Sequence, residues 1–430
     1  MLINMMNVLI FLLITTLVVD KTNQQQPQSQ QPNIFNYRSN MMNINNRNNR
    51  LGSCSRGDCY PETGDLLIGR TKFLHASSTC GLIQPERYCV LGTTRDATKC
   101  SVCDSTEPND LRKNNNSHSI DNIVSRKQGD RFNRWWQSEN GKQNVYIQFD
   151  LEAEFAFTHI IMTFKTFRPA AMVIEKSSNF GRTWKTYGYF ASNCHESFPG
   201  IATDMPKNLG DVYCETKYSS DTPSTKGEVV FRILPPTLIQ SRDPYSTEIQ
   251  ELLKITNLRI NFTKLHTFGD NLLDPREELK EKYYYAVYEM VVRGSCLCYG
   301  HASKCIPVEG VQYDSDKNGM VHGQCQCQHN TGGTNCEKCE PLFNDRPWMP
   351  ARSGQTNECK QCQCHNHARS CHFDADIYES TNFTSGGVCD DCLHNTYGRN
   401  CEKCKEDFYR DPRLSIDHIN TCKRLSFFLF

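Results

Sequence analysis

The placement of the cysteines constrains the fold of this chain more than any other feature. The 24 cysteines divide into three sets of eight, and two of these sets repeat one spacing pattern. The first repeat reads C-x-C-x6-C-x19-C-x-C-x8-C-x2-C-x19-C from Cys296 to Cys359. The second reads C-x-C-x6-C-x17-C-x2-C-x8-C-x2-C-x17-C from Cys362 to Cys422. His-Asn-Thr and Asn-Cys-Glu-Lys-Cys also recur, at 329–339 and 394–404. The pattern predicts a tandem repeat in which each unit contacts mainly its neighbour.

Units this small cannot bury enough apolar surface to be stable alone, so disulfides are expected to substitute for a core. Zinc is the competing interpretation, because three C-x2-C pairs have metal-ligand spacing: Cys336/Cys339, Cys389/Cys392 and Cys401/Cys404. The even cysteine count and a secretory start favour disulfides. The pair Cys100 and Cys103 has the spacing of a redox motif but lacks the βαβ surroundings of a thioredoxin-like site, which favours a structural role.

The beginning of the chain predicts secretion. An apolar run from Val8 to Val19, followed by polar sequence, is typical of a signal peptide, here assigned to 1–19. A membrane anchor is the alternative, and no later stretch is long and apolar enough to span a bilayer. Residues 20–50 are rich in Gln and Asn and are expected to be disordered. Three sequons predict surface glycans at Asn115, Asn261 and Asn382.

The composition gives no support for several classes of function. Lysine plus arginine equals aspartate plus glutamate, 48 of each, so nothing points to nucleic acid or an anionic membrane. The chain has no G-x-S-x-G, no H-E-x-x-H and no phosphate-binding glycine loop. We therefore expect no catalytic residues and no enzyme activity. The histidines are scattered, and His301, His365 and His367 are expected on the surface of the cysteine-rich units.

Residues 51–295 contain few cysteines and need an ordinary hydrophobic core. Apolar residues alternate with polar ones in five runs, which predicts an antiparallel β-sandwich. The runs are Val145–Leu151, Ile160–Phe164, Val229–Ile233, Leu258–Thr263 and Tyr284–Val292. Residues 177–181 read as a hairpin turn between two strands, and Asn261 falls on the polar face of its run.

A short motif lies between the first two cysteines. Arg56, Gly57 and Asp58 form an Arg-Gly-Asp tripeptide that would suit an integrin if it were presented outside the cell. Three-residue matches arise easily by chance, and an ordinary exposed polar loop is the alternative interpretation.

Longer blocks carry a family resemblance. Three segments resemble the laminin N-terminal domain: YPETGDLLIGR at 60–70, SSTCGL at 77–82 and WWQSENG at 135–141. The same domain is resembled by a fourth segment, FTHIIMTFKTFRPAAMVIEKSSNFGRTW at 157–184. The junction to the first laminin-type EGF-like module is resembled by YYYAVYEMVVRGSCLCYGHASKC at 283–305. The amino-acid sequences of these blocks are most similar to those of laminin beta chains of the beta-one/beta-two type.

The resemblance implies a mainly β fold. It implies a jelly-roll-like sandwich at 51–295, followed by a rod of two disulfide-rich EGF-like modules at 296–361 and 362–422. It also implies the module bridges, which are Cys296–Cys305, Cys298–Cys325, Cys327–Cys336, Cys339–Cys359, Cys362–Cys371, Cys364–Cys389, Cys392–Cys401 and Cys404–Cys422. Relatives of the sandwich can hold a structural calcium ion, whose ligands here the resemblance leaves unassigned.

The expected role is in the basement membrane of the extracellular matrix, with the N-terminal domains of laminin alpha and gamma chains as partners and integrins or other cell-surface receptors as further ones. Residues 423–430 form an apolar tail where a third module would open with C-x-C, and no coiled-coil heptads follow, which predicts a truncated form. The alternatives are a netrin-like secreted ligand for a cell-surface receptor, and a secreted thiol-dependent enzyme.

Overall fold

A computed structural model describes residues 54, 57–90, 99–109, 114–124, 132–220, 228–234, 246–313, 319–352 and 354–425. The predicted signal peptide at 1–19, the Gln/Asn-rich segment at 20–50, Arg56 and most of the tail lie outside the described residues. Within the described part, no helix has the length and apolar character needed to cross a membrane.

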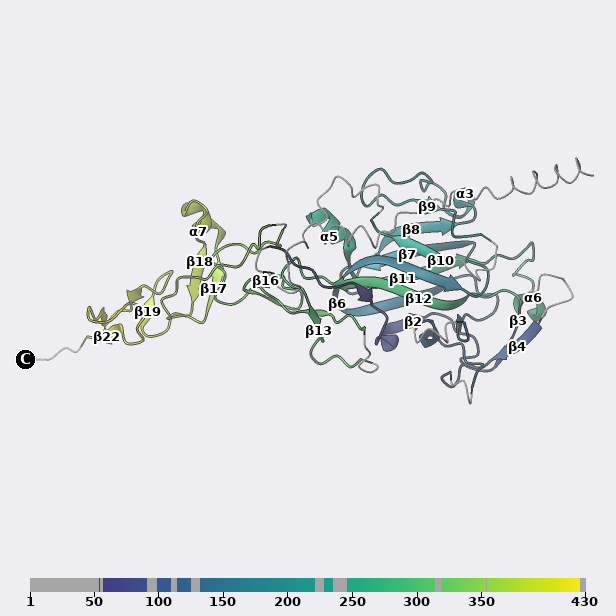
Figure 1. Ribbon diagram of the computed structural model, residues 1–430, viewed down its shortest axis with the longest axis horizontal. Helices are drawn as coiled ribbons and strands as arrows, with labels where there is room; N and C mark the ends of the chain where they lie inside the picture. Colours follow the sequence, from purple (N-terminus) through teal and green to yellow (C-terminus); the bar gives the residue numbers. More distant parts are fainter. Residues whose placement is uncertain are drawn as a thin grey trace, which may run out of the picture. The chain divides into compact units, whose positions relative to one another are not determined.

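The first large domain is mainly β, which confirms the predicted fold class (Figure 1). Its strands run in the order β1-β12-β6-β11-β7-β8-β9, with β2 and β10 also paired to β6 and β5 paired to β12. The strands are β1 Gly64–Asp65, β2 Leu74–Ala76, β5 Trp136–Gln137, β6 Val145–Phe164, β7 Ala171–Ser177, β8 Lys185–Ala191, β9 Cys214–Glu215, β10 Glu228–Arg232, β11 Lys254–Lys264 and β12 Ala286–Cys296.

Strand β6 connects the two halves of this sheet. Its residues up to Ala156 pair with β11, and those from Phe155 onward pair with β12. The sequence predicted two separate strands here, and that was wrong. No Gly, Pro or Asn interrupts residues 152–159, and the alternation continues through buried Ala153, Phe155 and Phe157, so the chain runs on as one strand.

The core of the domain consists of the inward-facing residues of these strands. Trp136, Phe149, Phe164 and Phe262 are fully buried and belong to one cluster. The predicted turn at 177–181 joins β7 to β8, where the Ser177 hydroxyl accepts a hydrogen bond from the Gly181 amide (2.9 Å). One pairing departs from the antiparallel expectation. Strand β9 lies parallel to β8, and the Cys194–Cys214 disulfide joins the segments at this edge.

Shorter helices and one hairpin lie in the loops between the strands of the sandwich. They are the hairpin of β3 Glu86–Val90 and β4 Lys99–Cys103, the 3-10 turns η1 Thr71–Phe73 and η2 Ile120–Ile123, and the helices α3 Cys194–Ser197, α5 Thr247–Leu253 and α6 Glu277–Lys280.

The cysteine-rich part contains small two-stranded ribbons joined by disulfides in place of a large core. In the first repeat the ribbons are β13 Cys305–Ile306 with β14 Gln324–Cys325, and β15 Thr331–Gly332 with β16 Lys338–Cys339. In the second they are β17 Ser370–Phe373 with β18 Gly387–Asp390, β19 Thr396–Tyr397 with β20 Lys403–Cys404, and β21 Phe408–Arg410 with β22 Cys422–Arg424. Helix α7 Ala375–Ser380 lies in the loop between β17 and β18.

Candidate functional site

All 24 cysteines are described, and the structure joins them in twelve disulfides. The eight bridges in the two repeats are the pairs that the family resemblance implies: Cys296–Cys305, Cys298–Cys325, Cys327–Cys336, Cys339–Cys359, Cys362–Cys371, Cys364–Cys389, Cys392–Cys401 and Cys404–Cys422. The sandwich domain holds Cys54–Cys59, Cys80–Cys103, Cys89–Cys100 and Cys194–Cys214, pairings on which the sequence made no prediction.

A buried ion pair inside the sandwich domain also forms hydrogen bonds with the first repeat. The Arg70 guanidinium is fully buried and donates to both carboxylate oxygens of Glu152, at 2.8 Å from Nε and 2.5 Å from Nη2. It also donates to the Leu66 carbonyl and to the Val321 carbonyl of the first repeat (2.7 Å). Tyr313 donates its hydroxyl to Glu152 from the same repeat. Every charged atom of the pair therefore has partners, as a buried charge requires.

A second set of contacts fixes the other side of this junction. The Asn335 side chain donates to the carbonyls of Glu154 (3.0 Å) and Leu297 (2.8 Å). The Tyr299 hydroxyl donates to the Glu154 carboxylate, which also pairs with Lys254 at 2.7 Å. Sandwich and first repeat thus share a polar network, so an isolated sandwich domain would expose several buried groups.

The ring closed by Cys54 and Cys59 lies against the first repeat. The Cys59 amide donates to the Gly300 carbonyl (3.0 Å), and a Cβ added to Gly57 would lie 3.1 Å from the Gly354 nitrogen. Gly57 is therefore buried, while Asp58 is partly exposed and Arg56 lies outside the described residues. The integrin interpretation of Arg56, Gly57 and Asp58 stays a prediction, and Gly354 of the first repeat covers the middle residue of the motif.

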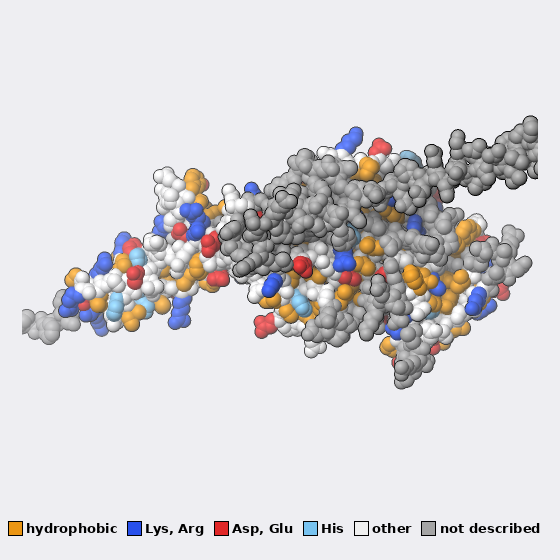
Figure 2. Space-filling model, in the orientation of Figure 1, with side chains coloured by type: hydrophobic (Ala, Val, Ile, Leu, Met, Phe, Trp, Pro, Cys, Tyr) orange, Lys and Arg blue, Asp and Glu red, His pale blue; other side chains and the backbone are white. Residues whose placement is uncertain are grey.

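An exposed apolar group marks the β3–β4 hairpin and the turn before it. We call Leu82, Ile83, Val90 and Val102 the hairpin surface, and Ile83 is 91% exposed. The Cys80–Cys103 disulfide lies at the start of this turn. Gly81 permits the close approach of the two segments, because its φ is 64° and an added Cβ would lie 2.4 Å from the Cys103 carbonyl oxygen. Figure 2 shows hydrophobic side chains on this part of the sandwich domain. Exposed apolar side chains in a disulfide-linked turn are suited to contact with another protein.

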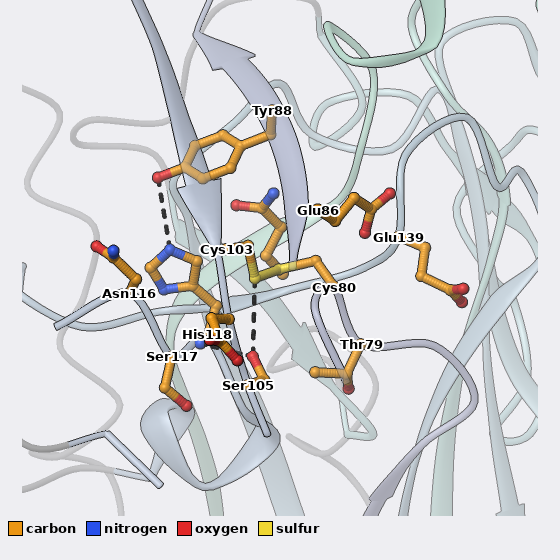
Figure 3. Close-up of a disulfide and its surroundings, with 12 residues drawn as sticks. Thr79, Cys80, Glu86, Tyr88, Cys103, Ser105, Asn116, Ser117, His118 and Glu139 are labelled. Carbon is orange, nitrogen blue, oxygen red and sulfur yellow. Dashed lines mark hydrogen bonds between the residues drawn. A yellow bond between two sulfur atoms is a disulfide. The ribbon is translucent and has the colours of Figure 1, made fainter. Parts of the chain in front are cut away.

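Figure 3 shows the surroundings of the Cys80–Cys103 disulfide. The ring of His118 is buried, stacks on Trp135 at 3.9 Å and contacts the Tyr88 hydroxyl through Nε2 at 3.4 Å. Burial, followed by the nearby Lys165 charge, lowers the pKa of His118 to about 4, so the ring is neutral. The Ser105 hydroxyl accepts from the His118 backbone amide, not from its ring, so the pair does not form a nucleophile and its base.

The three sequon asparagines differ in exposure. Asn115 and Asn382 are exposed, the latter in the left-handed region with φ 55°. Asn261 is partly buried in the middle of β11 and donates to the Glu175 carboxylate at 2.6 Å. Glycosylation of all three stays a prediction, and at Asn261 a glycan would have to replace this hydrogen bond.

The part of the chain that the structure describes holds no cluster of three carboxylate side chains suited to calcium. Among the described residues, the one cluster of three close potential side-chain ligands is Cys296, Cys298 and Cys325, and all three are in disulfides. Calcium binds oxygen ligands, so this cluster does not fit it. The three C-x2-C pairs considered for zinc, Cys336/Cys339, Cys389/Cys392 and Cys401/Cys404, are likewise in disulfides and offer no thiolates to a metal.

Two histidines contradict the sequence interpretation. His301 and His367 were expected on the surface, and both are fully buried. Each has a hydrogen-bond partner for both ring nitrogens, which is the condition for burying an imidazole. His365 is partly exposed and lies 3.0 Å from Asp417. The sequence did contain a sign that these histidines are structural, because they recur at matching positions of the two repeats.

Comparison with known proteins identifies both kinds of domain. The family pattern Laminin N-terminal (Domain VI) matches residues 59–294, Laminin EGF domain matches 296–359, and Laminin/attractin EGF domain matches 362–417. The chain is 57% identical to human laminin subunit beta-1 over 371 residues, and 55% identical to the Drosophila melanogaster subunit beta-1 over 374. Each match covers 86% of this chain and 21% of the relative, so the chain spans about a fifth of those subunits. It is also 44% identical to netrin-4 of Pongo abelii over 377 residues, covering 58% of that protein.

Proposed function

Because the chain belongs to the laminin N-terminal domain family, we propose that it forms the outer end of a laminin beta-type short arm. In this role it is a structural protein of the basement membrane and not an enzyme. The observation that carries the proposal is the match of one N-terminal domain at 59–294, followed directly by two laminin EGF-type modules, at 57% identity to a laminin beta subunit.

We propose further that the N-terminal domain binds the corresponding domains of laminin alpha and gamma chains during network assembly. The hairpin surface supports this, because it offers exposed apolar side chains beside the Cys80–Cys103 disulfide. A cross-link reduces the conformational entropy that the backbone at this place can lose on binding. Single contacts of this kind are expected to be weak, with a dissociation constant of about 1 μM.

The test is the effect of the purified 430-residue chain on polymerisation of intact laminin, followed by sedimentation. One added N-terminal domain occupies a binding partner without linking to another, so the amount of polymer should fall with dose. Chain that has been reduced and alkylated should have no effect, and neither should a fragment covering 296–422. Full polymer yield at a saturating dose of folded chain would rule out binding between N-terminal domains.

A matched pair of variants locates the contact. Ile83→Asp puts a charge on the hairpin surface and should raise the dose needed for half inhibition by about tenfold or more. Ile419→Asp makes the same change at a 57% exposed position in the second module and should leave the dose unchanged. Equal effects of the two variants would show that the hairpin surface is not the contact.

A netrin-like secreted ligand is the second candidate, favoured by the 44% identity to netrin-4. It predicts saturable binding of the chain to cells and unchanged laminin polymerisation, so the same two assays separate the candidates. Integrins are proposed as further partners through Arg56, Gly57 and Asp58, of which Gly57 is buried and Asp58 is partly exposed.

A further inference from the structure

One face of the sandwich sheet is partly open to solvent and carries a sequon in the middle of a strand. Strands β6, β11 and β7 lie side by side, with β11 between the other two (Figure 1). On β11, Arg259 and Asn261 point away from the core, because they alternate with the fully buried Leu258 and Ile260. Thr263, the last residue of the Asn-Phe-Thr sequon, lies on the same side. A glycan on Asn261 would therefore start above the sheet and not from a loop.

The neighbours of Asn261 across the sheet include an exposed aromatic ring. On β6 Asn261 lies directly opposite Tyr146, which is 40% exposed, and on β7 it lies opposite Val173. Residues directly opposite each other on one face have Cβ atoms about 4.5–5.5 Å apart. The first sugar on Asn261 Nδ2 thus begins within reach of the Tyr146 ring.

Polar groups on this face offer partners for a sugar. Arg259 donates to the Gln148 side chain from Nε (3.0 Å) and Nη2 (2.8 Å), and its guanidinium lies over the Trp184 ring at 3.8 Å. The Glu175 carboxylate accepts from Asn261 Nδ2 at 2.6 Å. A sugar on Nδ2 takes the place of one amide hydrogen, and its own hydroxyl or acetamido N–H can donate to Glu175 instead. We call the following residues the sequon face: Tyr146, Gln148, Glu175, Arg259 and Asn261.

The charges of the sequon face suit a neutral ligand. The positive charge of Arg259 is matched by Glu175, whose carboxylate lies 3.9 Å from Nη1. Asp150, the next outward residue of β6, accepts from Gln148 at 2.9 Å and adds a negative charge. Such a surface does not attract sulfated or phosphorylated ligands. An aromatic ring beside a few polar groups is the usual setting for an uncharged ligand such as N-acetylglucosamine.

We propose that Asn261 carries an N-glycan whose first N-acetylglucosamine packs on the Tyr146 ring and bonds to Glu175 and Arg259, so that the glycan covers the sequon face. The C–H groups on one side of the sugar ring lie against the aromatic ring, which removes apolar surface of both from water. The hydroxyls at the sugar's edge lie towards the charged pair. The inference does not rest on the proposed function.

Attachment of the glycan is compatible with the hydrogen bond that the structure shows. N-glycans are transferred in the secretory pathway before folding is complete, so the bond from Asn261 to Glu175 does not yet exist at that stage. The amide Nδ2 displaces a lipid diphosphate from C1 of the donor sugar. A C–N bond forms, a C–O bond breaks, and one amide proton is lost.

The test is hydroxyl-radical footprinting of the full chain, secreted from cells that make high-mannose glycans, because the oxidation rate of a side chain follows its exposure. Two variants form a matched pair. Thr263→Val destroys the sequon but keeps a β-branched side chain and the Asn261 amide, and Thr263→Ser keeps the sequon. Tyr146 should be oxidised about threefold or more faster in Thr263→Val than in the unmodified chain or Thr263→Ser, since no bulky glycan then covers it. Tyr409, 43% exposed in the second module, should be oxidised equally in all three.

Trimming separates a seated first sugar from general cover by a large glycan. An endoglycosidase that leaves one N-acetylglucosamine on each asparagine should leave Tyr146 protected, because the first sugar makes the contact. Removal of the whole glycan from the folded chain should expose Tyr146 as Thr263→Val does, and it gives the same comparison if that variant is not secreted.

Three results would overturn the proposal. The first is a secreted chain in which mass spectrometry finds Asn261 without a glycan. The second is equal oxidation of Tyr146 with and without the glycan, which would mean that the glycan extends into solvent. The third is protection that disappears on trimming to one sugar, which would show that the outer sugars shield Tyr146 and that the first sugar has no seat on it.

Discussion

Asp65 is a buried carboxyl where β1 pairs with β12, and it illustrates how single residues set the pH dependence of this fold. Its Oδ1 accepts from the Leu67 amide (3.1 Å) and the Val292 amide (3.3 Å). Burial raises the pKa of Asp65 from 3.8 to about 6, although both hydrogen bonds oppose the shift. Because the folded-state pKa is the higher one, the contribution of Asp65 to stability is full below about 3.8 and lost as the pH rises through 6.

Asp65→Asn keeps an acceptor oxygen for both amides and removes the ionisation. We expect the variant to be more stable than the unmodified chain at pH 7.5, by about 3 kcal/mol, and to differ from it by less than about 1 kcal/mol at pH 4. Thermal unfolding without reductant, measured from pH 4 to 8, gives the difference. A variant that is less stable at pH 7.5 would show that the charged carboxylate is needed by its two amide partners.

At the scale of elements, the ion pair between Arg70 and Glu152 connects β6 to the segment before β2 and to the first module. Arg70→Met removes the partner of a carboxylate whose side chain is 5% exposed, and we expect a loss of about 3–5 kcal/mol. Arg87→Met is the matched control, because Arg87 pairs with Glu281 at 2.8 Å while 56% exposed. Its loss should stay below about 1 kcal/mol.

The two variants are compared by thermal unfolding at one pH. Similar small losses of stability in both variants would mean that water reaches Glu152 once Arg70 is replaced. The ion pair would then not stabilise the junction between the sandwich and the first module. A large loss for Arg70→Met alone would support a junction in which sandwich and first module unfold together.

At the scale of the whole molecule, disulfides carry the stability of the modules. Each bridge typically contributes about 2–4 kcal/mol, and the modules have only small buried clusters besides. We expect all 24 cysteines of the secreted chain to be oxidised. Alkylation in denaturant without reductant should add no mass, and alkylation after reduction should add 24 labels. Labelling before reduction would contradict the disulfide framework and reopen the zinc interpretation.

The sequence alone determined the features that depend on spacing along the chain. Alternating residues such as Val145, Ile147 and Phe149 predicted a half-buried strand, because successive side chains in a strand point to opposite faces. The repeated cysteine spacing predicted two tandem modules. Both signals can be found in the sequence because each depends only on residues that are close along the chain. Long blocks such as 157–184 then indicated the family, and with it the fold class.

Only the tertiary structure decided what depends on contacts between distant segments. Arg70 meets Glu152 across 82 residues and the Val321 carbonyl across 251, and His329 meets Cys54 across 275. No periodicity marks such contacts, because they depend on how distant segments pack within the sandwich domain and against the first module. The same reason explains the error on His301 and His367. An imidazole is buried only where the fold supplies partners for both nitrogens, and those partners lie in other loops.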